Sequence, residues 1–101
     1  MATENRISRL HYIALIEDAG PDTAIGVWFP DLPGCFSAGD TVDEAMANAI
    51  EALALYADTA KTLPAPRTLS QLKADPVIAA DLAEHIVALI PLKTSLRPAA
   101  E

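Results

Sequence analysis

The sequence WFPDLPG at residues 28–34 constrains the fold of this chain more than any other stretch. Pro30 and Pro33 have a fixed φ and no N–H, so neither fits the interior of a central strand. Gly34 supplies a permissive backbone position directly after the second proline. The run therefore predicts a rigid turn between two strands, in which Pro30, Pro33 and Gly34 have structural roles.

Apolar, β-branched and aromatic segments on both sides of this turn predict strands. Turn-forming residues at 18–22 separate the first two strands, which are therefore expected to form a hairpin. Short helices are predicted at 68–73 and 75–83. The predicted strands are 10–17, 23–29, 34–38 and 85–92.

The segment after the third strand predicts one long helix, from about residue 41 to Lys61. Asp40 or Thr41 is the expected N-cap, and Thr41 with Glu44 fits the capping-box pattern. Apolar residues recur every three or four positions and form one broad stripe, and the many alanines predict a close approach to the sheet. Pro64 prevents the helix from continuing.

These elements predict an α+β fold with two layers. Three strands form an antiparallel meander, and a right-handed crossover is expected to place the fourth strand beside the first and parallel to it. The predicted order is 3-2-1-4, with the long helix on one face. Apolar residues of both parities on the second and fourth strands exceed what one helix can cover, so we expect a homo-oligomer, a dimer or tetramer, or a stable partner.

Trp28 and Phe29 are adjacent on a strand, so one faces each side of the sheet. One of them is expected in the core, and the other at the surface or at an interface, where aromatic residues are common hot spots. Asp31 can hydrogen-bond local backbone, and Leu32 can fold back as a plug. We predict Trp28, Asp31 and Leu32 as the partner-binding residues.

Length and composition predict one folded domain over residues 1–101, with a core at about 10–92 and flexible ends. The chain has 101 residues, of which 51% are hydrophobic and 21% charged, and this balance is typical of a globule rather than a disordered segment. It shows no secretion signal and no apolar run of the roughly 20 residues that cross a bilayer. Cys35 is its single cysteine, which excludes an intrachain disulfide, so a cytoplasmic setting is expected.

The formal charge of −7 constrains the partners. Nucleic-acid binding depends on Lys and Arg at phosphates, and the seven basic residues are scattered against fourteen acids. Direct binding of nucleic acid is therefore not expected. A basic protein partner would be favoured electrostatically, and the alternative is that the acidity only keeps the protein soluble.

An enzymatic role has weaker support in the sequence. A metal-dependent nuclease needs several carboxylates around divalent ions, and each available acid has a simpler explanation as a turn residue, a cap or a solvated helix position. Cys35 with His11 or His85 is a still weaker candidate for a nucleophile pair. No catalytic residue, metal or cofactor is therefore predicted. The acids considered are Asp31, Asp40, Asp43, Glu44, Glu51 and Asp58.

Several motifs together resemble the HicB family of antitoxins. They are YIALI (12–16), GVWFPDLPGC (26–35), GDTVDEA (39–45), EAL (51–53), LPAP (63–66), LSQL (69–72) and DP (75–76). The resemblance spans roughly residues 10–92, and its most specific part is the FPDLPGC run followed by a helix start. It implies a partial ribonuclease-H-like fold.

The resemblance implies that the chain neutralises a HicA toxin, a small basic protein that cleaves mRNA with a catalytic histidine. Family members usually add a C-terminal DNA-binding module, and the residues after Leu92 are too few and too proline-broken for one, so promoter binding is not expected. The alternative is an orphan oligomeric binding module of the same fold with no toxin partner.

Overall fold

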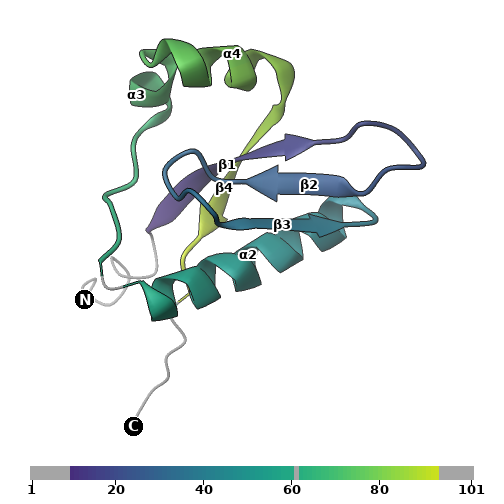
Figure 1. The fold of residues 1–101 in the computed structure, drawn as a ribbon, viewed down its shortest axis with the longest axis horizontal. Coiled ribbons are helices and arrows are strands. Elements are labelled where there is room, and N and C mark those ends of the chain that lie inside the picture. The colour runs from purple at the N-terminus through teal and green to yellow at the C-terminus, as the bar shows by residue number, and fades with distance from the viewer. Residues whose placement is uncertain (1–9, 61, 94–101) are drawn as a thin grey trace, which may run out of the picture.

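The computed structural model describes residues 10–60 and 62–93. The described chain forms a sheet with a long helix on one side and two short helices on the other (Figure 1). Its elements in chain order are β1 (His11–Glu17), β2 (Ile25–Trp28), β3 (Phe36–Gly39), α2 (Val42–Thr59), α3 (Leu69–Lys73), α4 (Pro76–Glu84) and β4 (Ile86–Pro91).

The sheet order is β3-β2-β1-β4, which confirms the predicted α+β fold and strand order. β1 pairs with both of its neighbours, and the register places Leu15 opposite Trp28 on one side and opposite Val87 on the other. β2 pairs in turn with β3, where Trp28 lies opposite Phe36. β2 and β3 are shorter than predicted because the proline turn occupies residues 29–35.

The expected direction of β4 is wrong: β4 runs antiparallel to β1, not parallel to it. A crossover through one helix would have returned the chain to a parallel strand. Here the segment 63–85 carries the chain back past the sheet through α3 and α4 before β4 begins (Figure 1). β4 therefore enters from the opposite end of the sheet.

Thr41, rather than Asp40, is the N-cap of α2. The Glu44 N–H donates to Thr41 Oγ1 at 3.1 Å, and Glu44 Oε1 accepts from the Asp40 N–H at 2.7 Å. These bonds satisfy donors at a helix start, where no intrahelical acceptor is available. The helix ends at Thr59, and Lys61, its predicted last residue, lies outside the described residues.

The main core lies between the sheet and α2. Small residues let the two layers approach closely, since Ala45 and Ala49 of the helix are fully buried and a Cβ on Gly39 would lie 2.6 Å from the Ala45 nitrogen. The opposite face of the sheet carries Ile13 and Leu15, which are also buried. The core cluster on the α2 side comprises Tyr12, Ala14, Ile16, Ile25, Val27, Phe29, Leu32, Cys35, Ala45, Ala49, Leu53, Ile90 and Leu92.

No helix in the described ranges 10–60 and 62–93 is long and apolar enough to cross a membrane.

Candidate functional site

The proline turn is held by two successive main-chain hydrogen bonds. The Leu32 N–H donates to the Phe29 carbonyl at 3.1 Å, and the Cys35 N–H donates to the Leu32 carbonyl at 3.0 Å. Gly34 has φ of +88°, a conformation that a residue with a Cβ adopts only with strain. The Tyr56 hydroxyl donates to the Pro33 carbonyl at 3.2 Å and so joins the turn to α2.

The structure separates the three residues that were predicted as partner contacts. Leu32 is 0% exposed and belongs to the core. Trp28 is half-buried on the sheet face away from α2, and its ring meets the His85 ring edge-on, with centroids 4.8 Å apart and an 82° angle between the planes. Trp28 therefore has exposed side-chain surface that could contact a partner, whereas Leu32 has none.

Asp31 joins the proline turn to a distant segment. Its carboxylate accepts hydrogen bonds from the Arg67 N–H at 2.8 Å and from Arg67 Nε at 2.6 Å. The Asp31 side chain is only 6% exposed, whereas that of Arg67 is 35% exposed. The hydrogen bond from the Arg67 side chain and the charge of Asp31 raise the pKa of Arg67. The local backbone bonds expected for Asp31 are replaced by a contact across 36 positions of sequence.

The same arginine reaches the start of α4. Arg67 Nη1 lies 3.5 Å from Asp75 Oδ2, and Asp75 is the N-cap of α4, where its Oδ1 accepts from the Val77 N–H at 3.0 Å. Asp31, Arg67 and Asp75 thus form one charged cluster that ties the proline turn to the layer of short helices.

The outer face of α2 carries an acidic stripe, defined as Glu44, Asn48, Glu51, Leu55 and Asp58. These positions are spaced by three or four residues, so they lie in one line along the helix. All five are exposed, and Leu55, at 61%, lies between two carboxylates. α2 contains no Lys or Arg. The sequence analysis explained acids of this helix as a cap or as solvated positions and did not group them into one surface. The spacing 51-55-58 is the signal that places Leu55 in line with them.

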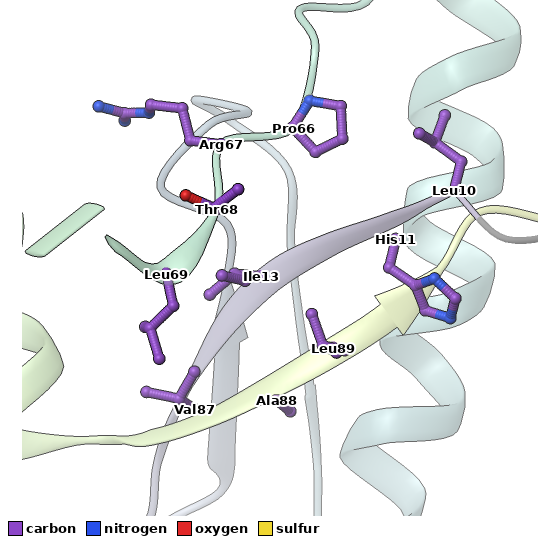
Figure 2. A pocket seen from close by; sticks show the side chains of 10 residues that line it. All are labelled: Leu10, His11, Ile13, Pro66, Arg67, Thr68, Leu69, Val87, Ala88 and Leu89. Atoms are coloured by element: carbon purple, nitrogen blue, oxygen red, sulfur yellow. The ribbon is translucent and has the colours of Figure 1, made fainter. Parts of the chain in front are cut away.

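An open apolar groove of about 490 Å³ lies on the sheet face opposite α2. Figure 2 shows the side chains of Ile13, Val87, Leu89 and Leu69 around it, with Arg67 pointing away from its centre. Its lining comes from β1, β4 and the segment 66–69, which are distant in sequence, so no local pattern predicted it. The full lining is Leu10, His11, Ile13, Pro66, Arg67, Thr68, Leu69, Val87, Ala88 and Leu89.

The geometry offers little to the enzymatic alternatives. Among residues 10–60 and 62–93, no group of three or more His, Cys, Asp or Glu side chains is placed to hold a metal ion. Cys35 is buried, and burial raises the pKa of its thiol, whereas a nucleophilic cysteine needs a lowered pKa. Nδ1 of His85 lies 2.8 Å from the Asp81 carbonyl, a contact that holds the ring at the end of α4.

Comparison with known proteins identifies the family. The family model described as "HicB_like antitoxin of bacterial toxin-antitoxin system" matches residues 12–100, nearly the whole chain. The chain belongs to the HicB-like antitoxin family. A curated protein of Haemophilus phage HP1, an uncharacterized 14.9 kDa protein from its rep-hol intergenic region, is 67% identical over 27 residues, which are 27% of this chain and 20% of the phage protein.

Solved HicB structures share the fold. The Burkholderia pseudomallei antitoxin HicB is 25% identical, with a TM-score of 0.64 over 85% of this chain and 64% of that protein. Its N-terminal domain alone is 28% identical, with a TM-score of 0.62 over 79% of this chain and 94% of the domain. A chain of the HicA3 and HicB3 toxin-antitoxin complex is 25% identical, with a TM-score of 0.62 over 82% of this chain and 98% of the other. This HicB-like chain thus corresponds to the N-terminal domain type and spans just under two thirds of the full-length antitoxin.

Proposed function

We propose that this HicB-like chain is an antitoxin that binds and neutralises a small, basic, mRNA-cleaving HicA-type toxin. The observation that carries the proposal is the similarity to a chain from a complex of HicA3 with HicB3, over 82% of this chain. The chain would act by binding rather than by catalysis, in the cytoplasm, where mRNA is available to the toxin.

The acidic stripe of α2 is the surface that best fits a basic toxin. Three carboxylates, from Glu44, Glu51 and Asp58, lie in one line, and Leu55 supplies exposed apolar surface between them. Complementary charge speeds encounter and fixes orientation, and an apolar anchor inside a polar rim contributes most of the affinity at many interfaces. Glu51, Leu55 and Asp58 therefore form the centre of the proposed toxin contact.

The proline turn offers a second, smaller contact through Trp28. Leu32 has no exposed surface, and the carboxylate of Asp31 is occupied by Arg67. A direct role of Trp28, Asp31 and Leu32 in toxin binding stays a prediction. Trp28→Ala tests it at the residue of the three whose side chain is partly exposed and not held by a charged partner. Loss of toxin binding in that variant would extend the interface from the α2 stripe to the far face of the sheet.

The experiment is an mRNA-cleavage assay with the small basic HicA-type toxin that the proposal expects to be encoded beside the gene of this chain. Wild type added in equal amount should stop cleavage. Glu51→Lys with Asp58→Lys should weaken inhibition by about tenfold or more, because each reversal replaces an attraction with a repulsion worth up to about 1 kcal/mol at the surface. Leu55→Ala should weaken it by a similar factor, since truncation of an interface anchor costs more than 1 kcal/mol.

The matched control is Glu17→Lys with Asp22→Lys. It changes the net charge by the same amount at two exposed residues near the β1–β2 loop, away from α2. It should inhibit the toxin nearly as well as wild type. Undiminished cleavage in the presence of wild type would overturn the proposed function, and equal loss in both double variants would leave the function intact but refute the α2 stripe as the contact.

A further inference from the structure

A small cleft, named the α2–β3 socket, lies between α2 and the start of β3. Its volume is about 290 Å³, just below the range of about 300–1,000 Å³ that is typical of small-molecule sites. One wall comes from the proline turn and β3, at Gly34, Cys35 and Phe36, and the other comes from α2. The α2 wall includes Leu55, so the socket adjoins the acidic stripe. A cleft of this size suits one or two side chains of a protein partner.

Small, shielded residues and large, exposed residues both line the socket. Cys35 is 4% exposed, and Ala52 of the α2 wall is half-buried. Phe36 is 70% exposed and Leu55 is 61% exposed. The small residues leave a recess, and the large ones present apolar surface beside it. Recesses of this kind accept the anchor side chains that contribute most of the affinity at many interfaces.

The two hydroxyl groups of the socket are already hydrogen-bonded within the chain. The Tyr56 hydroxyl donates to the Pro33 carbonyl at 3.2 Å. The Thr59 hydroxyl donates back into the helix, 3.3 Å from the Leu55 carbonyl and 3.2 Å from the Tyr56 carbonyl. Neither hydroxyl therefore offers a free proton, so the socket favours an apolar occupant. The bond from Tyr56 also holds the two walls together, which lowers the ordering cost of binding.

Negative charge lies directly beside the socket. Glu51 precedes Ala52 along α2, and Asp58 precedes Thr59. Both acidic side chains are exposed, and α2 contains no Lys or Arg. A second copy of this chain that used the same surface would bring like charges together, whereas a basic partner would be attracted. The socket therefore fits an apolar side chain that has a cation next to it.

We propose that the α2–β3 socket receives one leucine-sized or aromatic side chain of the toxin, from a segment in which lysine or arginine lies beside that side chain. This inference rests on the proposed function and names the feature by which the chain selects its toxin. The apolar side chain packs against Ala52 and Leu55, and the neighbouring cation meets Glu51 or Asp58. Charge alone would attract many basic proteins, whereas the socket discriminates against those without an apolar anchor next to the cation.

The experiment fills the socket and measures binding of the HicA-type toxin by calorimetric titration. Ala52→Leu occupies the recess with the chain's own side chain, so the Kd for the toxin should rise by about tenfold or more. Ala80→Leu is the matched control, because it makes the same change at an exposed helical position in α4, on the other side of the sheet. Its Kd should stay within about twofold of the wild-type value. Equal weakening in both variants would overturn the inference.

Nuclear magnetic resonance of the wild-type complex supplies a readout that needs no variant. Overhauser contacts should join the Ala52 methyl group to methyl or aromatic protons of the toxin, and the Ala80 methyl group should show none. Toxin binding by Ala52→Leu as tight as that of wild type, or a wild-type complex without toxin protons near Ala52, would overturn the socket and leave the proposed function intact. A wild-type chain that binds no toxin would overturn the proposed function, and the socket inference with it.

Discussion

Replacement of Asp31 by alanine should destabilise the fold more than any other single change to a charged side chain of the described chain. The carboxylate accepts two hydrogen bonds from Arg67, at 2.8 and 2.6 Å, and its side chain is 6% exposed. A hydrogen bond to a charged group contributes about 1.5–3 kcal/mol. The two bonds share one acceptor group and the arginine is one-third exposed, so water recovers part of the loss. We therefore expect the free energy of unfolding to fall by about 2–3 kcal/mol.

The assay is equilibrium unfolding in urea, with thermal unfolding as a check. For a domain of this size the loss corresponds to a decrease in Tm of about 10–20 °C. Asp31→Asn should lose about half as much, because the amide oxygen can still accept from the Arg67 N–H. Asp22→Ala, at an exposed loop residue, is the control and should stay within about 0.5 kcal/mol of wild type. An Asp31→Ala protein as stable as that control would refute the claim that this cluster joins the turn to the helical layer.

Three further changes test the packing and the buried titratable groups. Gly39→Ala should lower the free energy of unfolding, measured in urea, by about 2 kcal/mol or more. The new Cβ would lie 2.6 Å from the nitrogen and 2.9 Å from the Cα of Ala45, so the backbone must shift. A stability equal to that of wild type would show that the sheet and α2 are packed less closely than described. Burial, together with the Asp31 charge, raises the pKa of Tyr12 above its ordinary value of 10.0. Above pH 10 the folded state therefore keeps a proton that the unfolded state loses, so the contribution of Tyr12 to stability is complete below pH 10 and falls above it. Tyr12→Phe should show a shallower loss of stability at alkaline pH, and an unchanged slope would contradict this. Burial also raises the pKa of the Cys35 thiol, so alkylation of the native protein at pH 8 should be at least about tenfold slower than in urea, and equal rates would mean that the thiol is open to solvent.

Local chemistry explains what was predictable from the sequence. Prolines restrict the backbone wherever they occur, so the turn at 28–34 could be placed from the sequence. The cap Thr41 was also among the candidates, because a capping side chain bonds to main chain only two or three residues away. The order of the first three strands followed from their short connections. The fourth strand was placed beside the first on the premise of a right-handed crossover to a parallel strand, so its position was predicted correctly although its direction was not.

Features that depend on contacts between distant segments were missed. The direction of β4 is determined by how the segment 63–85 passes the sheet, and no residue in β4 itself encodes that direction. The partner of Asp31 lies 36 positions away, so a local interpretation of the turn assigned its bonds to nearby backbone. Leu32 was predicted both as a plug and as a partner contact, and its complete burial supports only the first role.

The central claim is that this HicB-like chain binds a HicA-type toxin, and calorimetric titration of the two purified proteins tests it most directly. We predict saturable binding with a Kd below about 1 µM, weaker at higher salt because screening reduces the attraction between the acidic stripe and a basic partner. Glu51→Lys with Asp58→Lys should raise the Kd by about tenfold or more, whereas Glu17→Lys with Asp22→Lys should change it little. Absence of binding at about 100 µM of each protein would contradict the account.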